Sequence, residues 1–236
     1  VTQTHWLTEF EIHHAQVPAY RFGRVFLAGD AAHVHSPAGG QGMNTGMQDA
    51  IALAWRLAMV QKGLAGHVVL ESYSPERTTV GEMVLRNATR MTEVATLANP
   101  AAQALRNHVL HFALGLHGVQ SRMALQMSEI DIVYKDSPLS DGGRHGDLVA
   151  GARLPPVSYA GPPPGAGTLP RFVLMAADTD RGAQLPARFP DLLEPSVRMP
   201  PQADVMLILR PDGYIGFVAE AGRWPEAEAY LAALEP

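Results

Sequence analysis

The residues best suited to chemistry lie at 24–44, where an apolar run leads into a carboxylate, two histidines and a glycine-rich loop. Asp30 follows the apolar run at 25–28, which is typical of a buried strand that delivers a side chain to a cleft. The glycines after it allow the backbone to approach a ligand closely. A helical pattern begins near Gly42, and the unpaired N–H groups and dipole of a helix start attract negative charge. The stretch predicts a strand–loop–helix that binds an anionic ligand.

Each of these features also has a purely structural interpretation. Asp30 could cap the loop or helix that follows it, and the glycines could form a turn that binds nothing. His33 and His35 form a His-x-His pair, and two imidazoles on one side of a strand can bind zinc or iron. We expect no metal here, because the sequence places no third ligand near the pair.

The elements that must position this loop are mostly helices. The segment 42–62 consists of good helix formers and is apolar on most sides, so we expect a helix buried under a sheet and ended by Gly63. A second helix is predicted at 74–98, with Ser74 as its N-cap and a proline in its first turn. A third helix is predicted at 100–127.

Two apolar stripes predict which helix faces are buried. The first helix carries Met47, Ile51, Ala54, Leu57 and Ala58 on one face. In the third helix, steps of four and three join Leu105, Val109, Phe112, Leu116, Val119 and Met123. We expect both stripes to face the protein core. In contrast, we interpret Glu76 and Arg77 as an exposed or half-buried pair with a structural role.

The two ends of the chain have different patterns. Residues 5–17 alternate like a strand, but the sequence shows no obvious partner for it. Prolines and glycines are frequent at 137–170, which we interpret as a linker and an irregular entry into a second unit. That unit is predicted to contain strands at 172–175, 205–209 and 214–218, the last two as a β-hairpin, and a closing helix at 225–234.

Composition narrows the classes of function. A net charge of −5 with no basic block argues against a nucleic-acid partner. The absence of cysteine excludes a disulfide framework, a thiolate metal site and a cysteine nucleophile, and it is compatible with a reducing cytoplasm. No apolar run reaches transmembrane length and no signal-peptide pattern opens the chain, so we expect no membrane partner.

The segment GDAAHVHSPAGGQGMNTGMQDAIALAWRLA at 29–58 resembles the second flavin-binding motif of the FAD-dependent aromatic hydroxylases. These are flavoprotein monooxygenases related to p-hydroxybenzoate hydroxylase and, more narrowly, to phenol and 3-hydroxyphenylpropionate hydroxylases. The segment 70–77 is similar to a further motif of the family. Shorter segments at 131–134, 146–147 and 209–213 are similar to parts of its thioredoxin-like C-terminal domain.

The resemblance implies an α/β fold with two parts. Residues 1–136 would be the C-terminal part of a Rossmann-like FAD/NAD(P)-binding domain with long helices, and residues 137–236 a small thioredoxin-like domain. The Gly-x-Gly-x-x-Gly turn that opens the family's FAD-binding domain is absent from this sequence. We therefore expect a C-terminal portion of such an enzyme, whose N-terminal FAD-binding half is a missing partner. The C-terminal domain has no Cys-x-x-Cys, so thiol redox activity is not expected.

The resemblance also implies a function. The enzyme would use FAD, NAD(P)H and O2 to hydroxylate a phenolic or other aromatic substrate through a flavin C4a-hydroperoxide. Asp30 would accept a hydrogen bond from the ribityl chain, and the start of the helix would stabilise reduced flavin by roughly 0.3–2 kcal/mol. The implied flavin contacts are Gly29, Asp30, Pro37, Gly39, Gly40, Gln41, Gly42, Met43 and Asn44. No catalytic base can be assigned, and His33 is expected to be structural or close to the flavin.

Two alternatives remain open on the sequence. The chain could be a non-catalytic folded fragment that binds no FAD alone, with the C-terminal domain serving oligomer contacts such as a homodimer. It could also be a related flavoprotein with halogenase or reductase chemistry.

Overall fold

The computed structural model describes residues 13–37, 40–158 and 161–236. The N-terminal described segment forms two small antiparallel pairs. β1 (Ala15–Gln16) pairs with β4 (His33–Val34), and β2 (Arg21–Phe22) pairs with β3 (Val25–Phe26). A 3-10 turn, η1 (Gly29–Ala31), joins β3 to β4. Residues 5–12 of the predicted N-terminal strand, and Gly39 of the predicted loop, lie outside the described residues.

The predicted buried strand at 25–28 is wrong in its burial and in its length. β3 has two residues and pairs only with β2, and the side chain of Val25 is 59% exposed. The reason is that β2–β3 is a hairpin at the surface, and no described element covers the outer face of Val25.

Three helices form the centre of the molecule. They are α1 (Gly42–Gln61), α2 (His67–Glu71) and α3 (Tyr73–Ala95), and α1 packs against both of the others. The predicted end of α1 is confirmed, since Gly63 adopts a positive φ of 69° just after the helix. The predicted N-cap Ser74 is wrong. α2 runs into α3 through the helical Ser72, and Ser74 Oγ instead accepts a hydrogen bond from the Tyr20 N–H.

The prediction for the buried face of α1 is also wrong. Met47 and Ile51 are more than half exposed, whereas the buried stripe contains Thr45, Asp49, Ala52, Arg56 and Met59. These five residues follow steps of four and three, so the helical period holds but the expected polarity does not. Charged side chains can occupy this face because α3 supplies partners of opposite charge.

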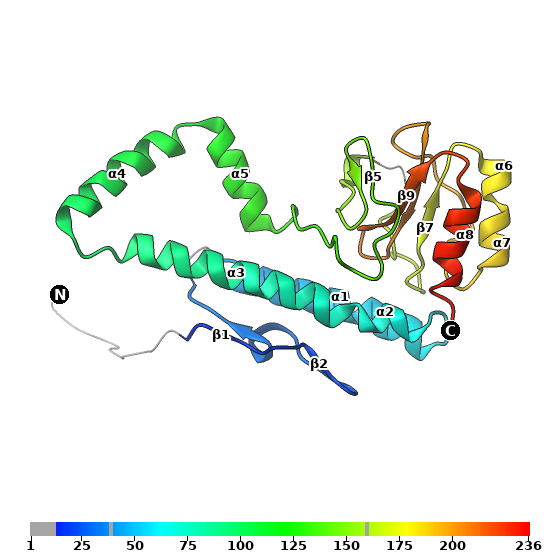
Figure 1. Ribbon diagram of the computed structural model, residues 1–236, viewed down its shortest axis with the longest axis horizontal. Coiled ribbons are helices and arrows are strands. Elements are labelled where there is room, and N and C mark those ends of the chain that lie inside the picture. Colours follow the sequence, from blue (N-terminus) through cyan, green and yellow to red (C-terminus); the bar gives the residue numbers. More distant parts are fainter. Residues whose placement is uncertain (1–12, 38–39, 159–160) are drawn as a thin grey trace.

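The third predicted helix is two helices, α4 (Pro100–Leu114) and α5 (His117–Ser128), separated at Gly115. Asn99 caps α4 by accepting hydrogen bonds from the N–H groups of Ala101 and Ala102. Together α4 and α5 form an arch that extends from the end of α3 (Figure 1). The side chain of Met123 lies outside the described residues, and for the rest of the apolar stripe the prediction that it faces the core is wrong, because the arch stands away from the other elements. Exposed residues of the stripe include Leu105, Val109, Phe112 and Leu116.

The C-terminal part is a small α/β unit. It contains the short pair β5 (Arg144–His145) and β6 (Leu148–Val149), the turn η2 (Pro156–Ser158), and an antiparallel three-stranded sheet. The sheet has the order β7 (Val173–Met175), β8 (Val205–Leu209), β9 (Ile215–Glu220). The helices are α6 (Thr179–Gly182), α7 (Gln184–Arg188) and α8 (Trp224–Ala232). The predicted strands, hairpin and closing helix are confirmed.

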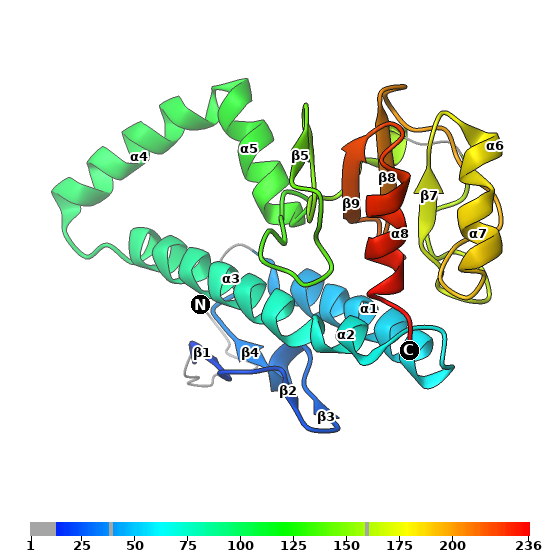
Figure 2. The same cartoon turned by 45° about the vertical axis from the view of Figure 1, so that its right-hand side comes forward.

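The sheet of the C-terminal unit shares its core with the central helices. Trp55 and Met59 of α1 and Val69 of α2 join Phe172, Leu174 and other buried residues on one face of the sheet. This unit and the strands β1 to β4 lie on opposite sides of the central helices (Figure 2). α1 therefore connects the glycine-rich loop at its N-terminus to the C-terminal unit near its C-terminus.

Candidate functional site

The loop that contains Asp30 is held tightly against α1. Gly29 has a φ of +56°, a conformation that glycine adopts at little cost. A Cβ added to Gly46 of α1 would lie 3.3 Å from the Gly29 Cα, so the missing side chains allow the turn and the helix to meet. Asp30 itself is exposed at the edge of this turn. The turn places its carboxylate on the surface beside the start of α1.

The buried carboxylate of Asp49, on α1, holds the turn in place. Asp49 Oδ2 accepts a hydrogen bond from the Gly29 N–H at 2.9 Å and lies 2.9 Å from His33 Nε2. Its Oδ1 accepts a hydrogen bond from Arg77 Nε at 2.6 Å. Burial acts to raise the pKa of Asp49, but the hydrogen bond with His33 and the charge of Arg77 outweigh it and hold that pKa below its usual value. Asp49 therefore ties η1, β4 and α3 to the same point of α1.

The two histidines stack beside this carboxylate. The rings of His33 and His35 lie 6.2 Å apart and nearly parallel, and the Tyr20 ring also stacks with His33 at 5.9 Å. His35 Nδ1 lies 2.8 Å from the Ser36 carbonyl oxygen. His33 Nδ1 and His35 Nε2 are buried without a hydrogen-bond partner. Within the described part of the chain no three His, Cys, Asp or Glu side chains gather as a metal site.

A pocket opens between the turn and the start of α1. Its volume is about 480 Å³. It is lined by Asp30, His33, Val34, His35, Pro37, Gly40, Gly42 and Met43. Five of the nine predicted flavin contacts are thus together on one pocket wall. Gly29 is bonded to Asp49 behind that wall, and Gln41 and Asn44 lie beside it in the helix start without lining the pocket.

The start of α1 belongs to this pocket wall. The Gln41 side chain, at the N-cap position, makes no capping hydrogen bond to the helix, and the first turn of α1 contains no acidic residue. The first amide groups of an α-helix have no partner inside the helix, and the dipole adds positive potential at that end. Gly42 and Met43, the first two helical residues, line the pocket. The arrangement is suited to an anionic or electron-rich group held against the backbone.

Sequence reasoning missed the buried polar residues that support the pocket. Besides Asp49, they are Thr45, Arg77, Tyr134 and Glu129. Arg77 Nη1 donates to the Tyr134 hydroxyl at 2.9 Å and Nη2 donates to the Thr45 carbonyl oxygen at 3.2 Å. The only sequence signal was the period of the stripe on α1, in which Thr45 and Asp49 share a face with apolar residues.

The expectation that Glu76 and Arg77 are exposed or half-buried is wrong, because both are almost fully buried. Glu76 accepts hydrogen bonds from Arg56 Nη2 at 2.5 Å and from Arg210 Nη1 and Nη2 at 2.8 and 2.9 Å. Arg210 also binds Asp212, and Asp212 accepts a hydrogen bond from Trp55 Nε1 at 3.0 Å. This network joins α1 and α3 to the C-terminal unit.

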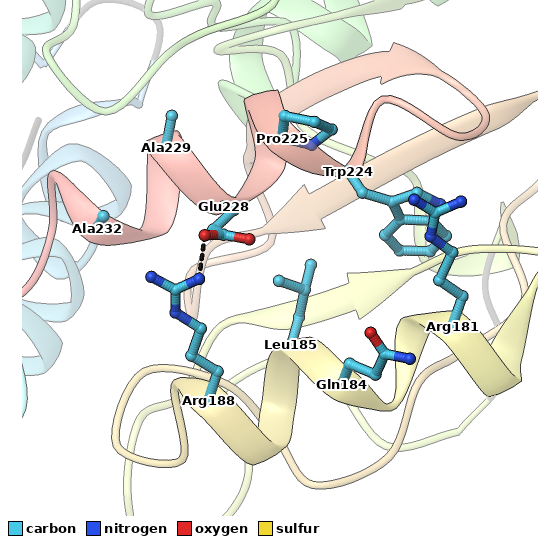
Figure 3. A pocket seen from close by; sticks show the side chains of 9 residues that line it. All are labelled: Arg181, Gln184, Leu185, Arg188, Trp224, Pro225, Glu228, Ala229 and Ala232. Carbon is cyan, nitrogen blue, oxygen red and sulfur yellow. Dashed lines mark hydrogen bonds and ion pairs between the residues drawn. The ribbon is translucent and has the colours of Figure 1, made fainter.

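A second hollow of about 440 Å³ lies in the C-terminal unit, between α7 and α8. Arg188 and Glu228 form an ion pair across it, and Arg181 lies over the ring of Trp224 (Figure 3). None of the predicted flavin contacts lines it. Its charged side chains are exposed, and it is separate from the pocket beside Asp30.

Comparison with known proteins agrees with this geometry. Residues 1–88 match the family model described as an FAD binding domain. The 6-methylpretetramide 4-monooxygenase of Streptomyces rimosus is 34% identical over 275 residues, which cover 99% of this chain and 48% of that protein. The pentachlorophenol 4-monooxygenase of Sphingobium chlorophenolicum is 49% identical over 89 residues, 38% of this chain and 16% of that protein. The chain is related to the FAD-dependent aromatic monooxygenases.

Solved structures of these monooxygenases share the fold. The anhydrotetracycline hydroxylase OxyS of Streptomyces rimosus superimposes with a TM-score of 0.73 at 30% identity, covering 93% of this chain and 46% of that one. The predicted mixed helix–sheet architecture of an FAD-dependent aromatic hydroxylase is confirmed. The chain spans about half the length, or less, of the monooxygenases that it matches. No helix among the described residues combines the length and the hydropathy that a bilayer crossing requires.

The pocket beside Asp30 meets the requirements of the FAD on which these monooxygenases depend. It is large enough to take part of a flavin, its backbone can be approached at glycines, and a helix start faces it. It lies inside the segment that matches the FAD binding domain.

Proposed function

We propose that this chain supplies one wall of the flavin site of an FAD-dependent monooxygenase that hydroxylates a phenolic or related aromatic substrate. The observation that carries the proposal is the pocket at the start of α1, with Asp30 on its edge. FAD, when bound, would supply oxygen activation, with NAD(P)H as the reductant and O2 as the oxygen donor.

Each part of the wall would have a separate role. The Asp30 carboxylate, at the edge of the pocket, would accept hydrogen bonds from a hydroxyl of the ribityl chain. The amide groups of Gly42 and Met43 would face the electron-rich edge of the ring system and stabilise negative charge there. Gly40 would allow the loop to approach that ring system. Asp49 would keep the turn in place without touching the ligand, since it is fully buried behind Gly29.

The names of the relatives support an aromatic substrate. They act on pentachlorophenol, 6-methylpretetramide and anhydrotetracycline, as their names state. No residue of this chain is proposed as a catalytic base.

We also propose that the site is completed by the N-terminal half of the FAD-binding domain, either upstream in the same polypeptide or as a separate chain. This partner is supported by the lengths of the relatives, because the chain matches only 48% of the 6-methylpretetramide 4-monooxygenase and 46% of OxyS. It is also supported by the surface of α1, where Met43, Met47 and Ile51 are exposed on the face away from the core. Alone, the chain would then bind FAD weakly or not at all. The exposed stripe of α4 and α5 would be covered by the same partner or by a second copy.

The C-terminal unit, residues 137–236, is proposed to be a thioredoxin-like domain. Its sheet order supports this assignment. The segment 193–198 forms parallel bridges to Phe172, just before β7, and to Met175 of β7. β8 is antiparallel to β7, β9 is antiparallel to β8, and α8 follows β9. With no cysteine in the chain, such a domain would have a structural role.

The test is FAD binding by the native polypeptide that contains this sequence, measured by flavin absorbance and fluorescence. Asp30→Ala should weaken FAD binding by roughly 10- to 100-fold, the effect of losing a charge-assisted hydrogen bond of about 1.5–3 kcal/mol. The matched control is Asp191→Ala, an exposed aspartate in the C-terminal unit, which should bind FAD like the wild type. A folded protein that stays colourless after FAD is added, or equal binding by both variants, would contradict the proposal.

A further inference from the structure

Glu129 is a buried acid in an unusual position. It follows the last residue of α5 and has a φ of +55°, the only non-glycine residue of the described chain in this left-handed region. Such a conformation costs of order 1–3 kcal/mol unless surrounding contacts impose it. The turn directs the side chain inward, where it is completely shielded from solvent. A contact with α1 must therefore hold Glu129 in place.

That contact is made with Thr45, in the first turns of α1. Thr45 Oγ1 lies 2.5 Å from Glu129 Oε1 and 3.0 Å from the Gln41 carbonyl oxygen. A threonine hydroxyl has one hydrogen, and a carbonyl oxygen can only accept. Both contacts are satisfied together when Thr45 donates to Gln41 and accepts from a protonated Glu129. The distance between Glu129 and Thr45 fits a short O–H···O bond in either direction, so the bond to the Gln41 carbonyl decides which group donates.

The rest of the environment favours the neutral form. Glu129 Oε2 is buried and has no hydrogen-bond partner, which costs far more for a carboxylate than for a carboxylic acid. A Thr45 hydroxyl that donated to Glu129 would lower the pKa of Glu129, as do the charges of Arg77 on α3 and His33 on β4, whereas Asp49 of α1 opposes a second negative charge. Arg77 and His33 are already hydrogen-bonded to Asp49. Burial, the largest influence, raises the pKa of Glu129.

We propose that Glu129 is a buried neutral carboxylic acid that positions the first turn of α1 by donating a hydrogen bond to Thr45. Its importance for the flavin rests on the function proposed above. The chain of bonds from Glu129 through Thr45 to the Gln41 carbonyl fixes the residue that immediately precedes Gly42 and the pocket. An uncharged Glu129 also leaves the positive end of the α1 dipole available, whereas a carboxylate close to it would compete with an anionic ligand.

The decisive comparison is between Glu129→Gln and Glu129→Ala, because a glutamine amide can donate to Thr45 but carries no charge. If Glu129 is a neutral donor, the glutamine variant should match the wild type in its urea midpoint below the unfolded pKa of glutamate, about 4.3, and the alanine variant should unfold at lower urea. Infrared spectra at neutral pH should show the carbonyl stretch of a protonated carboxyl in the wild type and not in the glutamine variant. Glu93→Gln, at an exposed glutamate of α3, is the control and should keep that band.

The pH dependence has a definite sign. An acid whose pKa is raised by folding contributes stability below its unfolded pKa, and this stability is lost as pH rises toward the folded pKa. As the pH rises from the unfolded pKa of Glu129 to its folded pKa, the wild type should therefore lose stability relative to Glu129→Gln. Absence of the infrared band, or a glutamine variant as unstable as the alanine variant, would overturn the proposal.

FAD affinity separates this proposal from the proposed function. In the native polypeptide, Glu129→Ala should weaken FAD binding by about tenfold, whereas Glu129→Gln should not. If the wild type and both variants fail to bind FAD, the proposed function fails. The infrared and unfolding results then still decide whether Glu129 is protonated. If both variants bind FAD like the wild type, Glu129 is structural only and its positioning role is refuted.

Discussion

Glu76 is the residue whose loss should damage the structure most severely. Its carboxylate is buried and accepts hydrogen bonds from two guanidinium groups, those of Arg56 on α1 and Arg210 at the end of β8. Ser137 Oγ donates to the same carboxylate. Burial acts to raise the pKa of Glu76, but the charges of Arg210 and Arg56 outweigh it and hold that pKa below its usual value. Glu76 is therefore ionised at neutral pH and neutralises two buried cations.

Glu76→Gln keeps the shape of the side chain but removes its charge. Arg210 keeps Asp212 as a partner, whereas Arg56 Nη1 lies 3.8 Å from that aspartate and loses its main ion pair. Breaking a buried ion pair by removing one partner costs about 3–5 kcal/mol. Since a typical protein is stable by only about 5–15 kcal/mol, the variant should lose a large part of its stability.

Urea unfolding, followed by circular dichroism and tryptophan fluorescence, measures this loss. Arg188→Ala is the control because it removes an ion pair whose side chains are 59% and 40% exposed. Such a surface pair is worth about 0–1 kcal/mol, so the control should unfold close to the wild type. A loss of less than about 1 kcal/mol in Glu76→Gln, similar to that of the control, would refute the assignment of Glu76 as the centre of this network.

Two further predictions concern the buried carboxylates. Asp49→Asn removes the charge that holds the turn at Gly29. FAD binding by the native polypeptide should therefore weaken by about tenfold, while the fold, measured by circular dichroism, is retained. Unchanged affinity would contradict the role of Asp49. Folding lowers the pKa values of Asp49, Glu76 and Asp212. The stability that these carboxylates contribute to the protein is therefore present above their unfolded pKa values and is lost as pH falls through the folded ones. Urea midpoints that stay constant below pH ~4 would contradict this pH dependence.

The sequence was sufficient for elements with strong local signals. α1 was predicted nearly to the residue, because good helix formers continue to Gly63, whose positive φ ends the helix. The hairpin of β8 and β9 was predicted because two apolar runs flank a turn at 210–213. In these cases the residues that determine the structure are neighbours in the chain.

Helix orientation was not predictable, because it depends on partners far away in the sequence. The buried face of α1 contains Asp49 and Arg56, and a polarity rule assigns such residues to the surface. They are buried because Arg77 and Glu76, on another helix, neutralise them. Similarly, the apolar stripe of α4 and α5 has no described element to cover it.

The candidate site was predictable in part for the same reason. Asp30 and the glycine-rich loop were found from their motif, and the structure gathers Asp30, Gly40 and Gly42 around one pocket. The supporting residues were missed. Glu129 meets Thr45 across 84 residues of sequence, and no local pattern marks that contact.

The central claim is that the turn at Gly29 and the start of α1 form one wall of a flavin site. Amide hydrogen exchange of the native polypeptide, measured with and without FAD, tests it most directly. The claim predicts that FAD slows exchange at residues 29–46, with little change in the hollow between α7 and α8. FAD binding that leaves exchange at 29–46 unchanged, or protects only the C-terminal unit, would contradict it.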